Sequence, residues 1–134
     1  MEVNNSFGPI DTAISGMQAQ NKSMGVISSN VANAQSTDNG QGQPYRRLEA
    51  IFKADDDGMG GVTLDEIAAD MSELPRILRP GHPDADEQGY VTMPNVDLPI
   101  EMVNLTMATR AYQANVAVLK RYQRMVETTL ELLR

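Results

Sequence analysis

The last third of the chain, residues 89–134, reads GYVTMPNVDLPIEMVNLTMATRAYQANVAVLKRYQRMVETTLELLR. From Asp97 onward this stretch contains no glycine, and its only proline is Pro99. Large apolar residues recur in it at alternating steps of four and three, which is the period of one long amphipathic helix. At a rise of about 1.5 Å per residue the helix would be roughly 55 Å long. A chain of 134 residues is too small to wrap a globular core around such a rod.

The apolar residues of this predicted helix form two neighbouring rows. The first row consists of Leu98, Met102, Leu105, Tyr112, Val116, Leu119, Val126, Leu130 and Leu133, interrupted by Thr109 and Gln123. The second row consists of Val103, Met107, Ala111, Ala114, Val118, Tyr122 and Met125. Two adjacent rows make an apolar face that is wider than a contact between two helices requires.

A shorter helix is predicted near the start of the chain, over residues 9–33. The four-and-three step is followed there by Ile10, Ile14, Met17, Met24 and Val31. Pro9 and Asp11 are typical of a first helical turn. The helix would be roughly 37 Å long, and Gly16 and Gly25 would each cost it about 1 kcal/mol relative to alanine. We therefore expect it to depend on a packing partner.

The middle of the chain reads as a small β-containing insert. Residues 34–44 are turn formers, and the alternation of residues 45–52 predicts a strand. Residues 62–68 have two interpretations, because apolar spacing also permits a helix over residues 63–72; we favour a strand that makes a hairpin with the first. Residues 73–88 carry three of the seven prolines and predict an extended connector before a short extended piece at 90–93.

These patterns predict a mainly α protein with a small β insert. The long N- and C-terminal helices would form an antiparallel coiled-coil pair from residues 1–34 and 96–134, and residues 35–95 would form a short outer domain that contains a β-hairpin. The shorter helix cannot cover two apolar rows on the longer one. Because a large exposed apolar face usually marks an association surface, we predict self-association or association with partner helices.

We predict that the subunit interface draws on the apolar rows of both helices and on polar residues set among them. A side-chain amide at a packed helix interface fixes its register. The predicted interface residues are Ile14, Met17, Met24, Ile27, Asn30, Val31, Asn33, Met102, Leu105, Arg110, Tyr112, Asn115, Val116, Leu119, Val126 and Leu130.

Composition excludes several other classes of protein. The formal net charge of −7 argues against a nucleic-acid-binding protein. The chain has no cysteine, so disulfides and thiolate metal sites are excluded. No stretch approaches the roughly 18 apolar residues that span a bilayer, so we expect a protein that is not inserted in a membrane. The N-terminus lacks the pattern of a cleavable secretory signal.

Candidate chemical sites are weak, and we predict no catalytic residue, no metal site and no cofactor. The acidic turn Asp55-Asp56-Asp57-Gly58 suggests a calcium loop, but the ligand positions do not fit. A metal cluster around His82, the only histidine, would use Asp84, Asp86 and Glu87 from a flexible connector. The basic residues Lys120, Arg121 and Arg124 could face an acidic partner, an anionic lipid or simply solvent.

Several segments resemble the bacterial flagellar axial proteins. At the N-terminal end, SGMQAQ at 15–20 and ISSNVANA at 27–34 resemble the signature of that family, with Ser29 and Val31 as departures from it. The similarity to basal-body rod proteins is nearly residue by residue in GYVTMPNVD at 89–97, EMVN at 101–104 and ATRAYQAN at 108–115. Related segments are QPYRR at 43–47 and PGHP at 80–83, whereas residues 55–74 depart most.

The resemblance implies a structural subunit of the proximal rod, which transmits torque from the membrane ring to the hook. It implies export through the flagellar type III apparatus without a cleaved signal peptide, and a place in the periplasmic rod. The implied neighbours are the rod proteins FlgB, FlgF and FlgG, the adaptor FliE and the membrane ring. The alternative function is a soluble helical adaptor or export chaperone that binds partner helices.

Overall fold

The computed structural model describes residues 8–54 and 60–133, which form two long helices and two β-hairpins. Helix α1 spans Gly8–Ala32 and helix α2 spans Leu98–Leu132. Between them lie the strands β1 (Leu48–Ala54), β2 (Val62–Ala69), β3 (Arg76–Leu78) and β4 (Tyr90–Thr92). This order confirms the predicted fold class.

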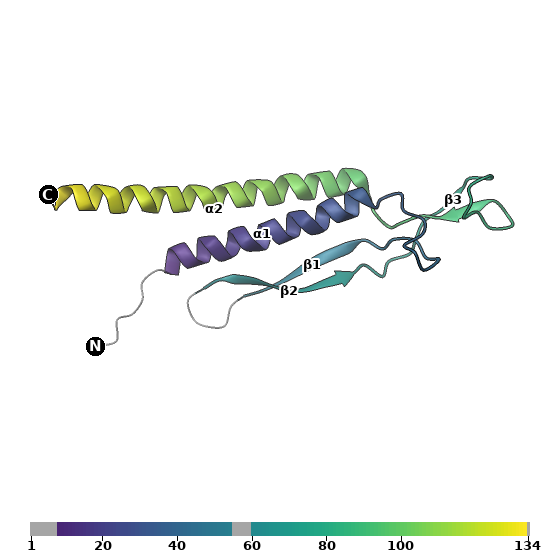
Figure 1. Ribbon diagram of the computed structural model, residues 1–134, viewed down its shortest axis with the longest axis horizontal. Helices are drawn as coiled ribbons and strands as arrows, with labels where there is room; N and C mark the ends of the chain where they lie inside the picture. Colours follow the sequence, from purple (N-terminus) through teal and green to yellow (C-terminus); the bar gives the residue numbers. More distant parts are fainter. Residues whose placement is uncertain (1–7, 55–59, 134) are drawn as a thin grey trace.

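The molecule is elongated and layered (Figure 1). Helix α1 lies between α2 on one side and the β1–β2 hairpin on the other. Strand β3 lies at the far end, away from both chain termini. The C-terminal part of α2 extends past the point where α1 begins.

Local sequence explains the ends of the two helices. The Asp97 carboxylate caps α2 by accepting a hydrogen bond from the backbone N–H of Ile100 at 3.2 Å, and Pro99 lies in the first turn. Both features are typical of helix starts. Helix α1 ends where the 34–44 loop begins: Gly40 and Gly42 have positive φ angles, and Asp38 accepts hydrogen bonds from both of their N–H groups.

The first hairpin confirms the strand interpretation of residues 62–68. Strands β1 and β2 are antiparallel, with an irregularity between Ile51 and Phe52. In β1, Leu48, Ala50 and Phe52 are partly buried while the residues between them are exposed, as the alternation predicted. The strand begins at Leu48, three residues later than predicted. Residues 45–47 instead contact the helices: Tyr45 bonds Asn30 of α1, and Arg47 bonds Glu101 of α2.

The extended connector predicted for residues 73–88 is wrong in part. Strand β3 lies inside it and pairs with β4, with Ile77 opposite Val91. The loop of this hairpin is organised by Asp86, whose carboxylate accepts hydrogen bonds from the N–H groups of Gln88 and Tyr90 at 2.9 and 2.8 Å. These hydrogen bonds lower the pKa of Asp86, and the bond from the Tyr90 N–H has the largest effect. Asp86 thus contributes to the order of a segment rich in proline and glycine, together with backbone hydrogen bonds such as that from Arg79 N–H to the Gly89 carbonyl.

The buried core is small for the length of the chain. Its apolar members among the described residues are Ala13, Ala19, Val26, Ile27, Val91, Met93 and Ala108. Three of the seven are alanines, which let helices approach closely but bury little apolar area. Close approach is most evident at Gly16, where an added Cβ would lie 2.7 Å from Nδ2 of Asn115 on α2.

Two glycines of α1 should therefore respond differently to alanine. An added Cβ at Gly25 meets no atom within 4 Å, so we expect Gly25→Ala to raise the free energy of unfolding by about 1 kcal/mol through helix propensity. In Gly16→Ala the same gain in helix propensity is offset by a loss of packing, because the added Cβ forces Asn115 to move. Urea denaturation of both variants measures the difference. Equal gains would contradict the close approach of the helices at Gly16.

Candidate assembly interface

A buried polar cluster joins the two helices to the first hairpin. Its central residues are Asn30 of α1, which is 1% exposed, and Glu101 of α2, which is fully buried. The Asn30 amide donates to Oε2 of Glu101 at 3.2 Å and to the carbonyl of Leu48 at 2.8 Å. Its oxygen accepts hydrogen bonds from the Tyr45 hydroxyl at 2.9 Å and the Leu48 N–H at 2.8 Å. The amide therefore fixes three separate segments against one another.

The charge of Glu101 is balanced by Arg47. The Nε of Arg47 donates to Oε1 of Glu101 at 2.6 Å, and this hydrogen bond is the main cause of the raised pKa of Arg47. Breaking a buried pair is costly because it leaves an uncompensated charge. Glu101 and Arg47 are 54 residues apart, so neither helical periodicity nor strand alternation could reveal the pair.

The cluster continues toward the second hairpin through Asn95. Its side-chain oxygen accepts a hydrogen bond from the backbone N–H of Arg47 at 2.8 Å. Its amide donates to the carbonyl of Asp70 at 3.0 Å and to the Ser72 hydroxyl at 2.8 Å. Asp70 also has a lowered pKa, chiefly because its carboxylate accepts a hydrogen bond from the Ser72 N–H. The segments before β1, after β2 and before α2 thus meet at one end of the molecule.

The structure divides the predicted interface residues into three groups. Ile27 and Asn30 are buried within the chain. Half-buried members are Met17, Met24, Val31, Asn33, Leu105, Tyr112, Asn115, Val116 and Leu119. Exposed members are Ile14, Met102, Arg110, Val126 and Leu130.

The middle of the first row of α2, from Leu105 to Leu119, is half-buried on the side of α1, and the Thr109 hydroxyl lies 3.6 Å from the sulfur of Met24. Asn115, which belongs to neither row, lies against Gly16. Of the polar residues that the sequence sets among apolar ones, Asn30 and Asn115 lie between elements of this chain. Arg110 instead points to solvent.

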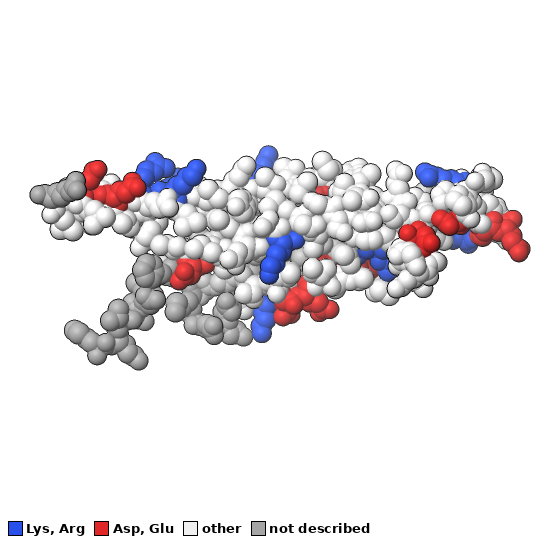
Figure 2. Space-filling model, viewed as in Figure 1, with Lys and Arg blue, Asp and Glu red and all other residues white. Residues whose placement is uncertain are grey.

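The second row of α2 lies beside the contact with α1, and its four large aliphatic residues are open to solvent, although Met107 and Ala111 also line a groove next to α1. Val103 is 58% exposed, Met107 64%, Val118 47% and Met125 58%. Charged side chains on the face shown in Figure 2 gather near the C-terminal end of α2, over the first hairpin and around the second hairpin, and leave the middle of the helix pair with few. The second row is therefore an unpartnered apolar stripe.

The accessible surface of the whole molecule leads to the same conclusion. It is 9794 Å², whereas a compact monomer of 14.7 kDa would expose roughly 6,900 Å². The apolar part of this exposure is seen in single residues of α2, such as Met107 and Met125, which are 64% and 58% exposed. Exposed apolar residues of this kind are characteristic of a chain that completes its packing with neighbours.

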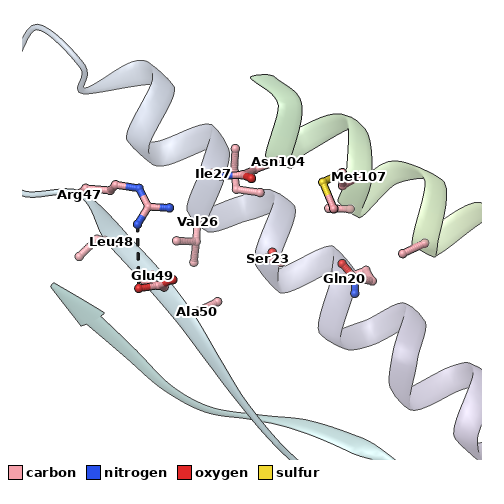
Figure 3. A pocket seen from close by; sticks show the side chains of 12 residues that line it. Gln20, Ser23, Val26, Ile27, Arg47, Leu48, Glu49, Ala50, Asn104 and Met107 are labelled. Atoms are coloured by element: carbon pink, nitrogen blue, oxygen red, sulfur yellow. Dashed lines mark ion pairs between the residues drawn. The ribbon is translucent and has the colours of Figure 1, made fainter. Parts of the chain in front are cut away.

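A groove of ≈ 360 Å³ runs beside α1, between α2 and β1 (Figure 3). Its lining residues include Ser23 and Ile27 of α1, Met107 of α2 and Glu49 of β1. Arg47 and Glu49 form a 4.0 Å ion pair at its edge. Apolar residues of α1, α2 and β1 contribute much of this lining, among them Val26, Ala50 and Ala111.

The candidate chemical sites of the sequence receive no support. Among residues 8–54 and 60–133, no group of three or more histidines, cysteines or carboxylates could hold a metal ion. In the connector, His82 Nδ1 lies 3.8 Å from an Asp84 carboxylate oxygen. The Asp55-Asp56-Asp57-Gly58 turn lies outside the described residues. In the part of the chain that is described, no helix has the length and apolarity to cross a membrane.

Two family models match the chain, and together they define a flagellar rod protein. The model described as "Flagella basal body rod protein" matches residues 10–39, and the model described as "Flagellar basal body rod FlgEFG protein C-terminal" matches residues 87–132. The matched residues include most of α1, all of α2 and the polar residues Asn30, Asn95 and Glu101.

Comparison with individual proteins identifies which kind of flagellar rod protein the chain resembles. The flagellar basal-body rod protein FlgC of Salmonella typhimurium is 42% identical over 91% of this chain and 93% of its own length. The FlgC proteins of Agrobacterium fabrum and Borreliella burgdorferi are each 36% identical, over 90% and 95% of this chain and 89% and 97% of their own lengths. The chain belongs to the FlgC family of flagellar basal-body rod proteins. It is a structural, non-enzymatic rod subunit that assembles with other rod proteins.

The ion pair between the buried Glu101 and the half-buried Arg47 makes a specific prediction for stability. We expect Arg47→Met to lower the free energy of unfolding by about 3 kcal/mol, because it leaves the Glu101 carboxylate buried without its charged partner. The matched control is Arg110→Met on the exposed side of α2, which should change stability by less than about 0.5 kcal/mol. Chemical denaturation measures both. Similar losses in the two variants would contradict the role given to the pair.

Proposed function

We propose that this chain is a subunit of the proximal rod and that it transmits torque through helix packing. The observation that carries the proposal is the solvent-exposed second row on α2, which lies beside a first row already used by α1. A helix that packs on one side within its own chain and offers an apolar stripe on another can join neighbours into a continuous layer. Torque then crosses many van der Waals contacts, and no bond has to be made or broken.

In this proposal residues 1–34 and 96–134 form the rod core, and residues 35–95 form its outer part. The predicted interface residues that are exposed in the free chain are the ones available to neighbours. They are Ile14, Met102, Arg110, Val126 and Leu130, and we add the second row of α2 to them. Asn30 and Asn115 would act indirectly, by holding α1 and α2 in the register that presents these residues.

The proposed neighbours are FlgB, FlgF, FlgG, the adaptor FliE and the membrane ring. The proposed route is export through the flagellar type III apparatus without removal of an N-terminal signal, followed by assembly in the periplasmic rod. Membership of the flagellar rod family supports this route. The alternative of a soluble adaptor or export chaperone is disfavoured by membership of the rod family.

The experiment places a charge in the second row. We expect Val118→Glu, introduced into a flagellated bacterium that lacks its own copy of the gene, to abolish motility, because a carboxylate cannot be buried unpaired between subunits. Val118 is 47% exposed in the free chain, so the unfolding free energy of the isolated subunit should change by no more than about 0.5 kcal/mol. Swarming, subunit content of isolated basal bodies and urea denaturation are the measurements.

The matched control is Gln113→Glu, which adds the same charge at an exposed α2 position outside both apolar rows. This variant should retain motility and appear in basal bodies. Full motility of Val118→Glu would overturn the assignment of the second row to the interface. Absence of the unaltered subunit from basal bodies would overturn the proposed function itself.

A further inference from the structure

We propose that the groove between α1 and the first hairpin binds the C-terminal end of α2 from a second copy of this chain. The contact rests on the proposed function, because it is a contact between rod subunits, and it specifies which surfaces meet. It would join the hairpin side of one copy to the free end of the long helix of another.

The groove is apolar and open. It has a volume of ≈ 470 Å³ and is lined by Lys22, Gly25, Val26 and Ser29 of α1 and by Leu48, Leu64 and Ile67 of the hairpin. The α1 residues recur at helical spacing and form one face of the helix. Ile67 is 48% exposed, which is unusual for a large apolar residue on the helix-facing side of a strand. The groove is thus an unfilled part of the packing between α1 and the hairpin.

Gly25 gives this groove its depth. A Cβ added there would meet no atom within 4 Å, so no contact within the described chain requires glycine at this position. Glycine nevertheless costs a helix interior about 1 kcal/mol relative to alanine. A helix from another copy that packs close to the α1 backbone would explain why position 25 has no side chain.

Within residues 8–54 and 60–133, the C-terminal end of α2 extends beyond the reach of α1. Asn30 lies beside Glu101 and Gly16 beside Asn115, so the antiparallel register places Gly8, where α1 begins, level with Gln123. Beyond that level the first row of α2 continues without α1 (Figure 1). Its members there are Val126, Leu130 and Leu133, which are 39%, 61% and 80% exposed.

Charges favour this occupant. Lys22 stands at the edge of the groove, and Glu127 and Glu131 flank Leu130 on the protruding end of α2. None of these three side chains forms an ion pair within residues 8–54 and 60–133. A helix end with Leu130 in the groove would bring its carboxylates toward the lysine of the other copy.

The two surfaces are different and lie on different parts of the molecule. Every copy carries one groove and one protruding helix end, so the contact is heterologous and leaves both surfaces available for further copies. A contact of this kind builds rings or helical arrays rather than isolated dimers. The proposed contact is therefore compatible with a tube-shaped assembly.

The absence of cysteine from the chain permits a direct test by disulfide trapping. Two differently tagged copies, one carrying Ile67→Cys in the groove and the other Leu130→Cys, are expressed together in the bacterium that lacks its own copy of the gene, and isolated basal bodies are oxidised. We expect a disulfide-linked dimer that contains both tags. The matched control replaces Leu130→Cys by Gln113→Cys, an exposed α2 position away from the first row, and should give at least about tenfold less dimer.

A charge exchange tests the same contact without cysteines. Lys22→Glu should reduce swarming severalfold, and Glu127→Lys combined with Glu131→Lys in the same chain should restore it. Motile cells with both cysteine copies in their basal bodies but with no dimer above the control would overturn the contact. Capture of Leu130→Cys by a different rod protein would overturn it as well. Absence of even the unaltered subunit from basal bodies would overturn the proposed function and the contact together.

Discussion

The burial of one carboxylate, Glu101, constrains the rest of this structure. A fully buried carboxylate is tolerated only when its charge and its lone pairs are satisfied, and here Arg47 and Asn30 satisfy them. Those partners come from the start of the hairpin and from the end of α1. The chain therefore has to bring three distant segments together at one end before the helices can pack, and the same contacts set the register along which Asn115 meets Gly16.

A fold held mainly at one end leaves much of its apolar surface uncovered. The core contains few large side chains, and the second row of α2 and the protruding part of its first row remain exposed. In an isolated domain, so little buried apolar area would hardly offset the conformational entropy that is lost on folding. For a rod subunit it is useful, because the same surface stabilises the assembly once neighbours cover it.

Much of this fold could be predicted from local patterns in the sequence. The four-and-three spacing predicted both helices to within about two residues at each end. The alternation in residues 45–52 predicted which residues of β1 are partly buried and which are exposed. The β3–β4 hairpin was missed because only three residues of each strand pair, within a segment whose prolines and glycines indicate irregular structure. The Arg47–Glu101 pair was missed because long-range pairing leaves no local periodicity, although an acidic residue inside an apolar helical face was a visible signal.

Hydrogen exchange on α2 tests the central claim, that neighbouring subunits complete the packing of this helix. In the isolated subunit we expect slow exchange near Glu101 and Ala108, where the helix is anchored, and fast exchange from Leu119 to Leu132, where little of it is buried. In isolated basal bodies the whole helix should exchange slowly. Equally strong protection along all of α2 in the free subunit would contradict the account, because the helix would then need no neighbours to be stable.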